Sequence, residues 1–175
     1  MPAHRAVIVP TPPEVDADLA DVRRRFDPQF NSVPSHLTLV FPHRVRSDAL
    51  LRHVNSVAGG HRPIQVQLAG FAGSQNAWLF ARVTRGNDDL IALHDDLYTG
   101  MLAVALDRTS IFVPHVTVGQ VNGASALGAA LDAVDHDMAW EFEVQALTIY
   151  RPGDARTRQI EAGLSSFRCN RAGGC

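Results

Sequence analysis

Residues 35–41 read Ser-His-Leu-Thr-Leu-Val-Phe, and residues 113–119 read Val-Pro-His-Val-Thr-Val-Gly. Each stretch places a histidine and a threonine two residues apart in an apolar, β-branched run, which is typical of a short strand. Because side chains alternate along a strand, the two polar residues of each stretch are expected on one face. Each strand can then bury its aliphatic face and present an imidazole beside a hydroxyl, within reach of one small anion. The two pairs are His36 with Thr38 and His115 with Thr117.

Composition narrows the class of protein. The chain has 175 residues, 46% of them hydrophobic, which suffices for one domain or two small lobes. A formal net charge of −2 excludes a broad basic surface for a long nucleic acid, so a nucleic-acid substrate should be short or gripped locally. There is no apolar run of about 20 residues to span a membrane and no visible secretory leader. Cys169 and Cys175 lie in a tail, 169–175, that is expected to be flexible. We interpret them as reduced thiols of a cytoplasmic protein.

The elements around the two motifs repeat along the chain. A strand and an amphipathic helix precede each motif, and a helix and a strand follow it. The elements before the motifs are the strands 5–9 and 77–84 and the helices 14–26 and 88–102. The helices that follow are expected to start near Ser47 and Ser125, 11 and 10 residues after the two histidines. The next strands contain Ile64 and Phe142, 28 and 27 residues after them. Matching offsets of this kind indicate an internal duplication.

The duplication predicts an α+β fold. We expect two lobes of antiparallel sheet with outer helices, related by a pseudo-two-fold axis. The axis would bring the two His-x-Thr strands together in a central cleft. Residues 1–168 are expected to form this single bilobal domain.

Other basic residues and histidines have simpler interpretations. Arg23, Arg24 and Arg25 end the helix 14–26, where they suit the helix dipole. His94 sits on an apolar helix stripe and is expected to be a hydrogen-bonded core residue.

The motifs His-Leu-Thr-Leu and His-Val-Thr-Val, 79 residues apart, resemble those of the 2H phosphoesterase superfamily. This superfamily includes bacterial 2′-5′ RNA ligase-like proteins and RNA cyclic phosphodiesterases. The resemblance covers nearly the whole chain, and Phe112 resembles the aromatic residue that often precedes the second motif. It implies a bilobal α+β fold in which His36 and His115 are catalytic and Thr38 and Thr117 bind phosphate.

One position departs from the family pattern. Many members carry an arginine shortly after the second motif, where this chain has Gln120. Arg108 and Arg151 are candidates to supply that charge to the substrate. Phe112 and Tyr150 are candidates to stack on a base, although aromatic residues in strands more often belong to the core.

The residue types themselves suit phosphoryl chemistry. A histidine titrates near neutrality and can take a proton from water or give one to a leaving oxygen. Threonine hydroxyls can donate hydrogen bonds to the phosphate oxygens that gain charge. The residues do not decide which histidine is the base. No nucleoside-triphosphate loop and no zinc-binding HExxH motif is present, so no cofactor or metal is expected.

These observations favour a metal-independent phosphodiesterase. It would open the 2′,3′-cyclic phosphates of RNA ends, short oligonucleotides or nucleotides, with reversible 2′-5′ RNA ligation as the reverse reaction. We expect a monomer. Two alternatives stay open: a module that binds a nucleotide or RNA end in the same cleft without turnover, and a metal-dependent phosphodiesterase.

Overall fold

The computed structural model describes residues 2–74, 76–152 and 160–166. Its helices and strands follow one another in the order β1 (Ala3–Pro10), α1 (Pro13–Phe26), β2 (His36–Val45), α2 (Ser47–Ala58), β3 (Ile64–Gly73), β4 (Trp78–Arg85), α3 (Asn87–Leu97), the 3₁₀ helix η1 (Gly100–Ala105), β5 (His115–Gln120), α4 (Gly123–Asp132), β6 (Ala139–Val144), β7 (Ala146–Tyr150) and β8 (Ile160–Ser166). No helix in these ranges is long and apolar enough to cross a membrane.

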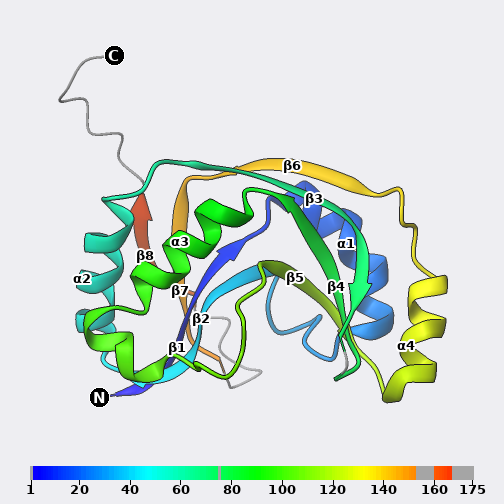
Figure 1. Ribbon diagram of the computed structural model, residues 1–175, viewed down its shortest axis with the longest axis horizontal. Helices are drawn as coiled ribbons and strands as arrows, with labels where there is room; N and C mark the ends of the chain where they lie inside the picture. The colour runs from blue at the N-terminus through cyan, green and yellow to red at the C-terminus, as the bar shows by residue number, and fades with distance from the viewer. Residues whose placement is uncertain (1, 75, 153–159, 167–175) are drawn as a thin grey trace, which may run out of the picture.

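The strands form one curled, antiparallel sheet in the order β6-β3-β4-β5-β2-β1-β7-β8 (Figure 1). The strands β2 and β5, which carry the His-x-Thr motifs, are its two central strands. We call β2-β1-β7-β8 the first lobe and β5-β4-β3-β6 the second lobe. The predicted bilobal α+β fold is confirmed, and the lobes share a single continuous sheet.

The pseudo-two-fold axis passes between the two central strands. β2 and β5 are registered at one residue pair, Leu37 with Val116. These residues hold equivalent positions in the two motifs, since each follows its histidine by one residue. A two-fold axis between strands pairs a residue with its own counterpart, and this register does so.

The lobes do not coincide with the two halves of the sequence. β3 follows the first motif but pairs with β4 and β6 in the second lobe, while β7 and β8 return to the first lobe beside β1. The helices are exchanged between the lobes in the same way. Helix α1 contacts β5 of the second lobe, and α3 contacts β2 of the first lobe. In Figure 1, α1 and α4 lie at one end of the sheet and α2 at the other. The halves of the chain are therefore interlocked, because each half contributes strands to both lobes.

The helices after the motifs begin at slightly different places from those predicted. α2 begins at Ser47, but Arg46 holds the N-cap position, and the Ser47 hydroxyl accepts a hydrogen bond from Arg5 Nε at 2.8 Å. α4 begins at Gly123, two residues before Ser125, with Asn122 as its N-cap. The predicted tail, 169–175, lies outside the described residues, and the domain boundary at 168 stays a prediction.

The predicted alternation of β2 holds for its first four residues. Leu37 and Leu39 are buried, and His36 and Thr38 are half-buried on the other face. Strict alternation would next bury Phe41, yet Phe41 is 55% exposed. The register between β1 and β2 shifts twice beside this point, and these irregularities turn the strand. Phe41 therefore reaches the open side of the sheet.

The contact between α1 and β5 depends on Gly119. A Cβ atom at this position would lie 2.5 Å from Phe26 Cβ and 3.1 Å from the Phe26 carbonyl oxygen. We expect Gly119→Ala to lower the free energy of unfolding by about 1–3 kcal/mol, because the helix must shift off the sheet. Urea unfolding with a constant m-value measures the change.

Gly128, on α4, is the matched control. A Cβ atom there meets nothing within 4 Å, so Gly128→Ala should be neutral or stabilising by about 1 kcal/mol. Equal unfolding midpoints for Gly119→Ala and the unsubstituted protein would contradict the close approach of α1 to β5.

Candidate active site

The two motifs place their four polar side chains on one face of the sheet. With Leu37 opposite Val116, the neighbouring positions put His36 across from Thr117 and Thr38 across from His115. In a paired antiparallel ladder, directly opposite Cβ atoms are about 5 Å apart and diagonal neighbours about 7–8 Å apart. The two histidines are diagonal neighbours. The two imidazoles and the two hydroxyls are therefore grouped on one face of the sheet.

The two histidines are held in the same way. His36 Nδ1 lies 2.8 Å from the Pro34 carbonyl oxygen, and His115 Nδ1 lies 2.7 Å from the Val113 carbonyl oxygen. A carbonyl oxygen only accepts hydrogen bonds, so Nδ1 carries the proton in both rings. In the neutral imidazole the lone pair is therefore on Nε2. Each motif thus fixes a basic nitrogen at the tip of its histidine, two residues after the carbonyl that orients the ring.

Burial lowers the pKa of both histidines from the ordinary value of 6.5. For His36 the loss of hydration is the largest cause of the lowered pKa, and the bond to the Pro34 carbonyl opposes it. The positive charge of Arg23 lowers the pKa further, while the carboxylates of Asp27 and Asp16 raise it. For His115 the loss of hydration again outweighs the bond to the Val113 carbonyl. Both side chains are nevertheless only half-buried, so each keeps an open edge. Near neutral pH the neutral form of each ring is favoured.

The segment before His36 is clamped by buried polar groups. Ser35 is 1% exposed, and its backbone N–H donates to Asp16 Oδ1 at 2.6 Å. Thr11 bonds both the carbonyl oxygen and the hydroxyl of Ser35. These bonds fix the chain immediately before the first histidine.

Arg23 has a larger role than the helix-dipole interpretation predicts. It is 2% exposed, pairs with Asp16 at 3.1 Å and with Asp27 at 2.9 Å, and donates Nη2–H to the Val33 carbonyl at 2.7 Å. Val33 stands three residues before His36. Arg23 therefore braces the segment that leads into the first histidine, while its neighbours Arg24 and Arg25 are exposed as the dipole interpretation requires.

The corresponding position in the second half is Phe112, three residues before His115. Its ring stacks on His94 at a centroid distance of 3.8 Å with an interplanar angle of 1°. His94 is 4% exposed and its Nδ1–H donates to the Leu39 carbonyl at 2.8 Å, which confirms the predicted core role. A residue of the preceding helix thus holds the segment before each histidine, by charge in one half and by stacking in the other.

Both threonine hydroxyls are available for a ligand. Thr38 and Thr117 are half-buried on the same face as the histidines. Within the described part of the chain, neither hydroxyl forms a hydrogen bond with another residue. A polar atom in this position can donate to a phosphate oxygen without breaking an internal bond.

Of the remaining predicted site residues, Tyr150 lies beside the site, and the two arginines do not line a pocket. The Tyr150 ring lies 6.2 Å from the His36 ring, between centroids, and so borders the site. Arg108 and Arg151 are exposed, and neither lines a pocket described here. Gln120 is exposed at the end of β5, opposite Trp78. The roles predicted for Arg108 and Arg151 in substrate binding stay predictions.

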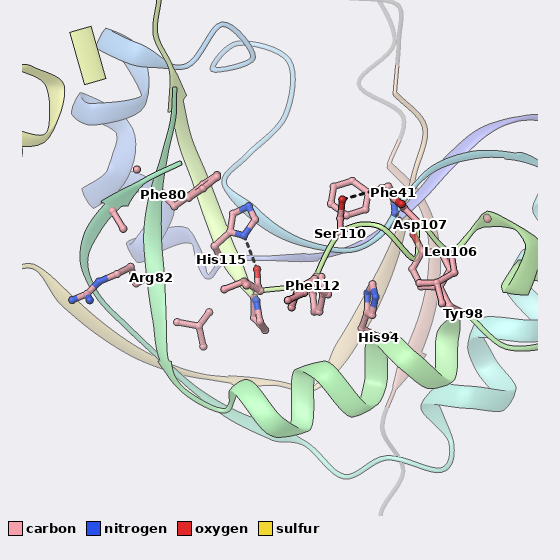
Figure 2. A pocket seen from close by; sticks show the side chains of 17 residues that line it. Phe41, Phe80, Arg82, His94, Tyr98, Leu106, Asp107, Ser110, Phe112 and His115 are labelled. Atoms are coloured by element: carbon pink, nitrogen blue, oxygen red, sulfur yellow. Dashed lines mark hydrogen bonds between the residues drawn. The ribbon is translucent and has the colours of Figure 1, made fainter. Parts of the chain in front are cut away.

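Two pockets flank the site, each between the helix that precedes a His-x-Thr strand and the segment that leads into it. The His115 pocket has a volume of about 760 Å³ and is formed by α3, β4, the tip of β3, Phe41 and residues between 105 and 115 (Figure 2). The α1 pocket, of about 560 Å³, is formed by α1, residues 30–34 and Tyr150. His115 lines the first pocket, and His36 lines neither.

Four aromatic side chains that line the His115 pocket were not predicted as site residues. Phe80 touches the His115 ring at a centroid distance of 4.0 Å, and Tyr98 accepts a hydrogen bond from the Phe41 backbone N–H at 3.0 Å. Phe41 and His94 complete the group. Phe80 faces Thr117 across β4 and β5, so only a correct strand register could have identified it.

The described residues contain no group of three histidine, cysteine or acidic side chains that could hold a metal ion. The titratable groups at this face include the two imidazoles, with Tyr150 beside His36 and Arg82 opposite His115 in the pairing of β4 with β5. The two imidazoles can support proton transfer on either side of a bound phosphorus atom.

Sequence comparison identifies the family. The model of the 2′-5′ RNA ligase superfamily matches residues 11–156 of the chain. A Bacillus licheniformis protein with the name "Putative phosphoesterase" is 30% identical over 103 residues, which are 56% of this chain and 59% of that protein. A Bacillus cereus protein with the same description is 31% identical over 119 residues, 65% of this chain and 67% of that protein.

Structure comparison agrees with this assignment. Escherichia coli LigT complexed with 3′-AMP has a TM-score of 0.64 at 19% identity, over 90% of this chain and 92% of that one. LigT complexed with NADP⁺ has a TM-score of 0.61 at 21% identity over the same shares. These likenesses concern the fold. The family model, which matches residues 11–156, shows that the chain belongs to the 2′-5′ RNA ligase superfamily, a branch of the 2H phosphoesterases.

Proposed function

We propose that the chain is a metal-independent phosphodiesterase that opens 2′,3′-cyclic phosphates of RNA ends or nucleotides. The observation that carries the proposal is the pair of identically oriented imidazoles, His36 and His115, with Nδ1 bonded to a carbonyl and Nε2 left as the basic atom. The relatives named as phosphoesterases and the nucleotide complexes of LigT support this substrate class.

The reaction needs one proton removed and one proton delivered. One neutral histidine accepts a proton from the attacking water, and the other, protonated, gives a proton to the ribose oxygen that leaves phosphorus. The Thr38 and Thr117 hydroxyls donate to the non-bridging oxygens, whose charge grows in the transition state. With a ribose 5′-hydroxyl in place of water, the same proton transfers form a bond from phosphorus to O5′ and break the bond to O3′, which leaves a 2′-5′ linkage and a free 3′-hydroxyl. The monomeric state and the cytoplasmic location stay predictions of the sequence.

Substitution of either histidine tests the proposal. We expect His36→Ala and His115→Ala each to lower kcat on a nucleoside 2′,3′-cyclic phosphate by at least about 10²-fold, because a positioned acid or base contributes about 10²–10⁴. Hydrolysis is measured with excess EDTA present throughout. His4→Ala, at an exposed position on β1, is the matched control and should leave the rate unchanged.

Each alternative gives a different result in this assay. Tight nucleotide binding without turnover would identify a binding module. Activity that EDTA abolishes and Mn²⁺ or Mg²⁺ restores would identify a metal-dependent enzyme and contradict the proposal.

The threonine hydroxyls should act on the chemical step. We expect Thr38→Val and Thr117→Val to lower kcat about 10²-fold with a smaller change in KM, since the hydroxyl is used most in the transition state. Valine keeps the branched shape that suits a strand. The control Thr84→Val, at an exposed position on β4, should behave like the unsubstituted enzyme. A change in KM alone would assign the hydroxyls to ground-state binding.

The pH dependence follows from the lowered pKa values. The base must be neutral, so activity rises as pH passes its pKa, and the acid must be charged, so activity falls as pH passes the acid's pKa. Because the pKa of both histidines lies below 6.5 in the free protein, the profile of kcat/KM should peak below that value. Above the peak it should fall about tenfold per pH unit. A flat profile between about pH 5 and 9 would contradict two-histidine catalysis.

A further inference from the structure

The residues that face the two histidines from the neighbouring strands differ in charge. Pro10 of β1 lies opposite His36, and Arg82 of β4 lies opposite His115. The two positions are equivalent, because β1 flanks β2 in the sheet as β4 flanks β5. Directly opposite side chains of an antiparallel pair point to the same face, with Cβ atoms about 5 Å apart. The duplicated site therefore has a cation beside its second histidine and a proline ring beside its first.

The Arg82 side chain is exposed and available to a ligand. Within the described ranges of the chain, it forms neither an ion pair nor a hydrogen bond. Arg85, three residues later on β4, is instead paired with Glu141 at 3.2 Å. A guanidinium presents five N–H donors and keeps its charge throughout the physiological pH range. Arg82 can therefore bind an anion without breaking an internal contact.

Gly70 of β3 provides the space in which the Arg82 guanidinium lies. A Cβ atom at Gly70 would be 3.2 Å from Arg82 Nη2. The side chain thus extends from β4 towards β3, and in Figure 2 it points away from the other labelled residues. Neighbouring strands are about 4.8 Å apart, so β3 lies roughly 10 Å from β5. The guanidinium is therefore beyond a phosphate bound between the two histidines, on the side of the second lobe.

We propose that Arg82 binds a second phosphoryl group of the substrate, the one on O5′ of the ribose that carries the cyclic phosphate. This inference rests on the proposed function and specifies its substrate. At an RNA end, O5′ carries the phosphate nearest to O2′ and O3′, either as the diester to the preceding nucleotide or as a terminal monoester. A guanidinium can donate two N–H bonds to either form. Because the first lobe has Pro10 at the equivalent position, the 5′-phosphoryl group lies towards the second lobe.

Three substrates test the inference: a nucleoside 2′,3′-cyclic phosphate, the same compound with a 5′-phosphate, and a dinucleotide that ends in the same cyclic phosphate. We expect the unsubstituted enzyme to favour a 5′-phosphorylated substrate in kcat/KM by about fivefold, the effect of an exposed charged pair. Arg82→Gln should remove this preference, and Arg82→Lys should keep part of it. Arg85→Gln removes the same charge from the same strand and should keep all of it. Whether the monoester or the dinucleotide gains more identifies which form of the 5′-phosphoryl group is bound.

Binding is measured in parallel, so that the two proposals fail separately. Calorimetric titration with a nucleoside 3′-phosphate and with the corresponding 3′,5′-bisphosphate should show the same preference and the same loss in Arg82→Gln. If no cyclic phosphate is hydrolysed, the proposed function fails while the titration still decides the inference. Equal affinity for the two ligands, an unchanged preference in Arg82→Gln, or an equal loss in Arg85→Gln would overturn the role assigned to Arg82.

Discussion

The structure depends on the pairing of β2 with β5 at Leu37 and Val116. This pairing joins the two lobes into one sheet, and it brings equivalent residues of the duplicated motif together. Its consequence is chemical as well as architectural. Because each registered residue is flanked by a histidine on one side and a threonine on the other, a single antiparallel contact places both pairs on the same face. A slip of one residue would turn one pair away from the other.

The two halves support equivalent geometry with different interactions. Arg23 holds the carbonyl of Val33 through a buried ion-pair network, and His94 holds the ring of Phe112 by stacking. The first interaction commits the Arg23 charge to internal ion pairs beside the α1 pocket, which has a volume of about 560 Å³. The second lies beside the larger His115 pocket, which is lined by aromatic side chains. The two histidines hold equivalent places but have different surroundings.

The features that repeat along the chain could be predicted from the sequence alone. Alternation within each motif predicted that His36 shares one strand face with Thr38 and that His115 shares one with Thr117. The matching offsets predicted the duplication and the bilobal α+β fold, although the sheet makes β7 rather than β6 the counterpart of β3. Features that depend on contacts between the halves could not be predicted. Offsets along the chain do not say which lobe β3 joins.

Local patterns also misled at particular positions. The helix dipole accounts for the position of three arginines at the end of α1. It does not predict the burial of Arg23, which depends on ion pairs with Asp16 and Asp27 and on a hydrogen bond to the Val33 carbonyl. The exposure of Phe41 follows register shifts between β1 and β2 that the sequence of β2 alone does not show.

The proposed function depends on the orientation of the two imidazoles, which long-range ¹H–¹⁵N correlation spectra of the histidine rings report. We expect His36 and His115 both to carry the neutral proton on Nδ1 at alkaline pH, and both Nε2 resonances to shift together when inorganic phosphate is added. A proton on Nε2 of either ring, or a phosphate response confined to one of them, would contradict it.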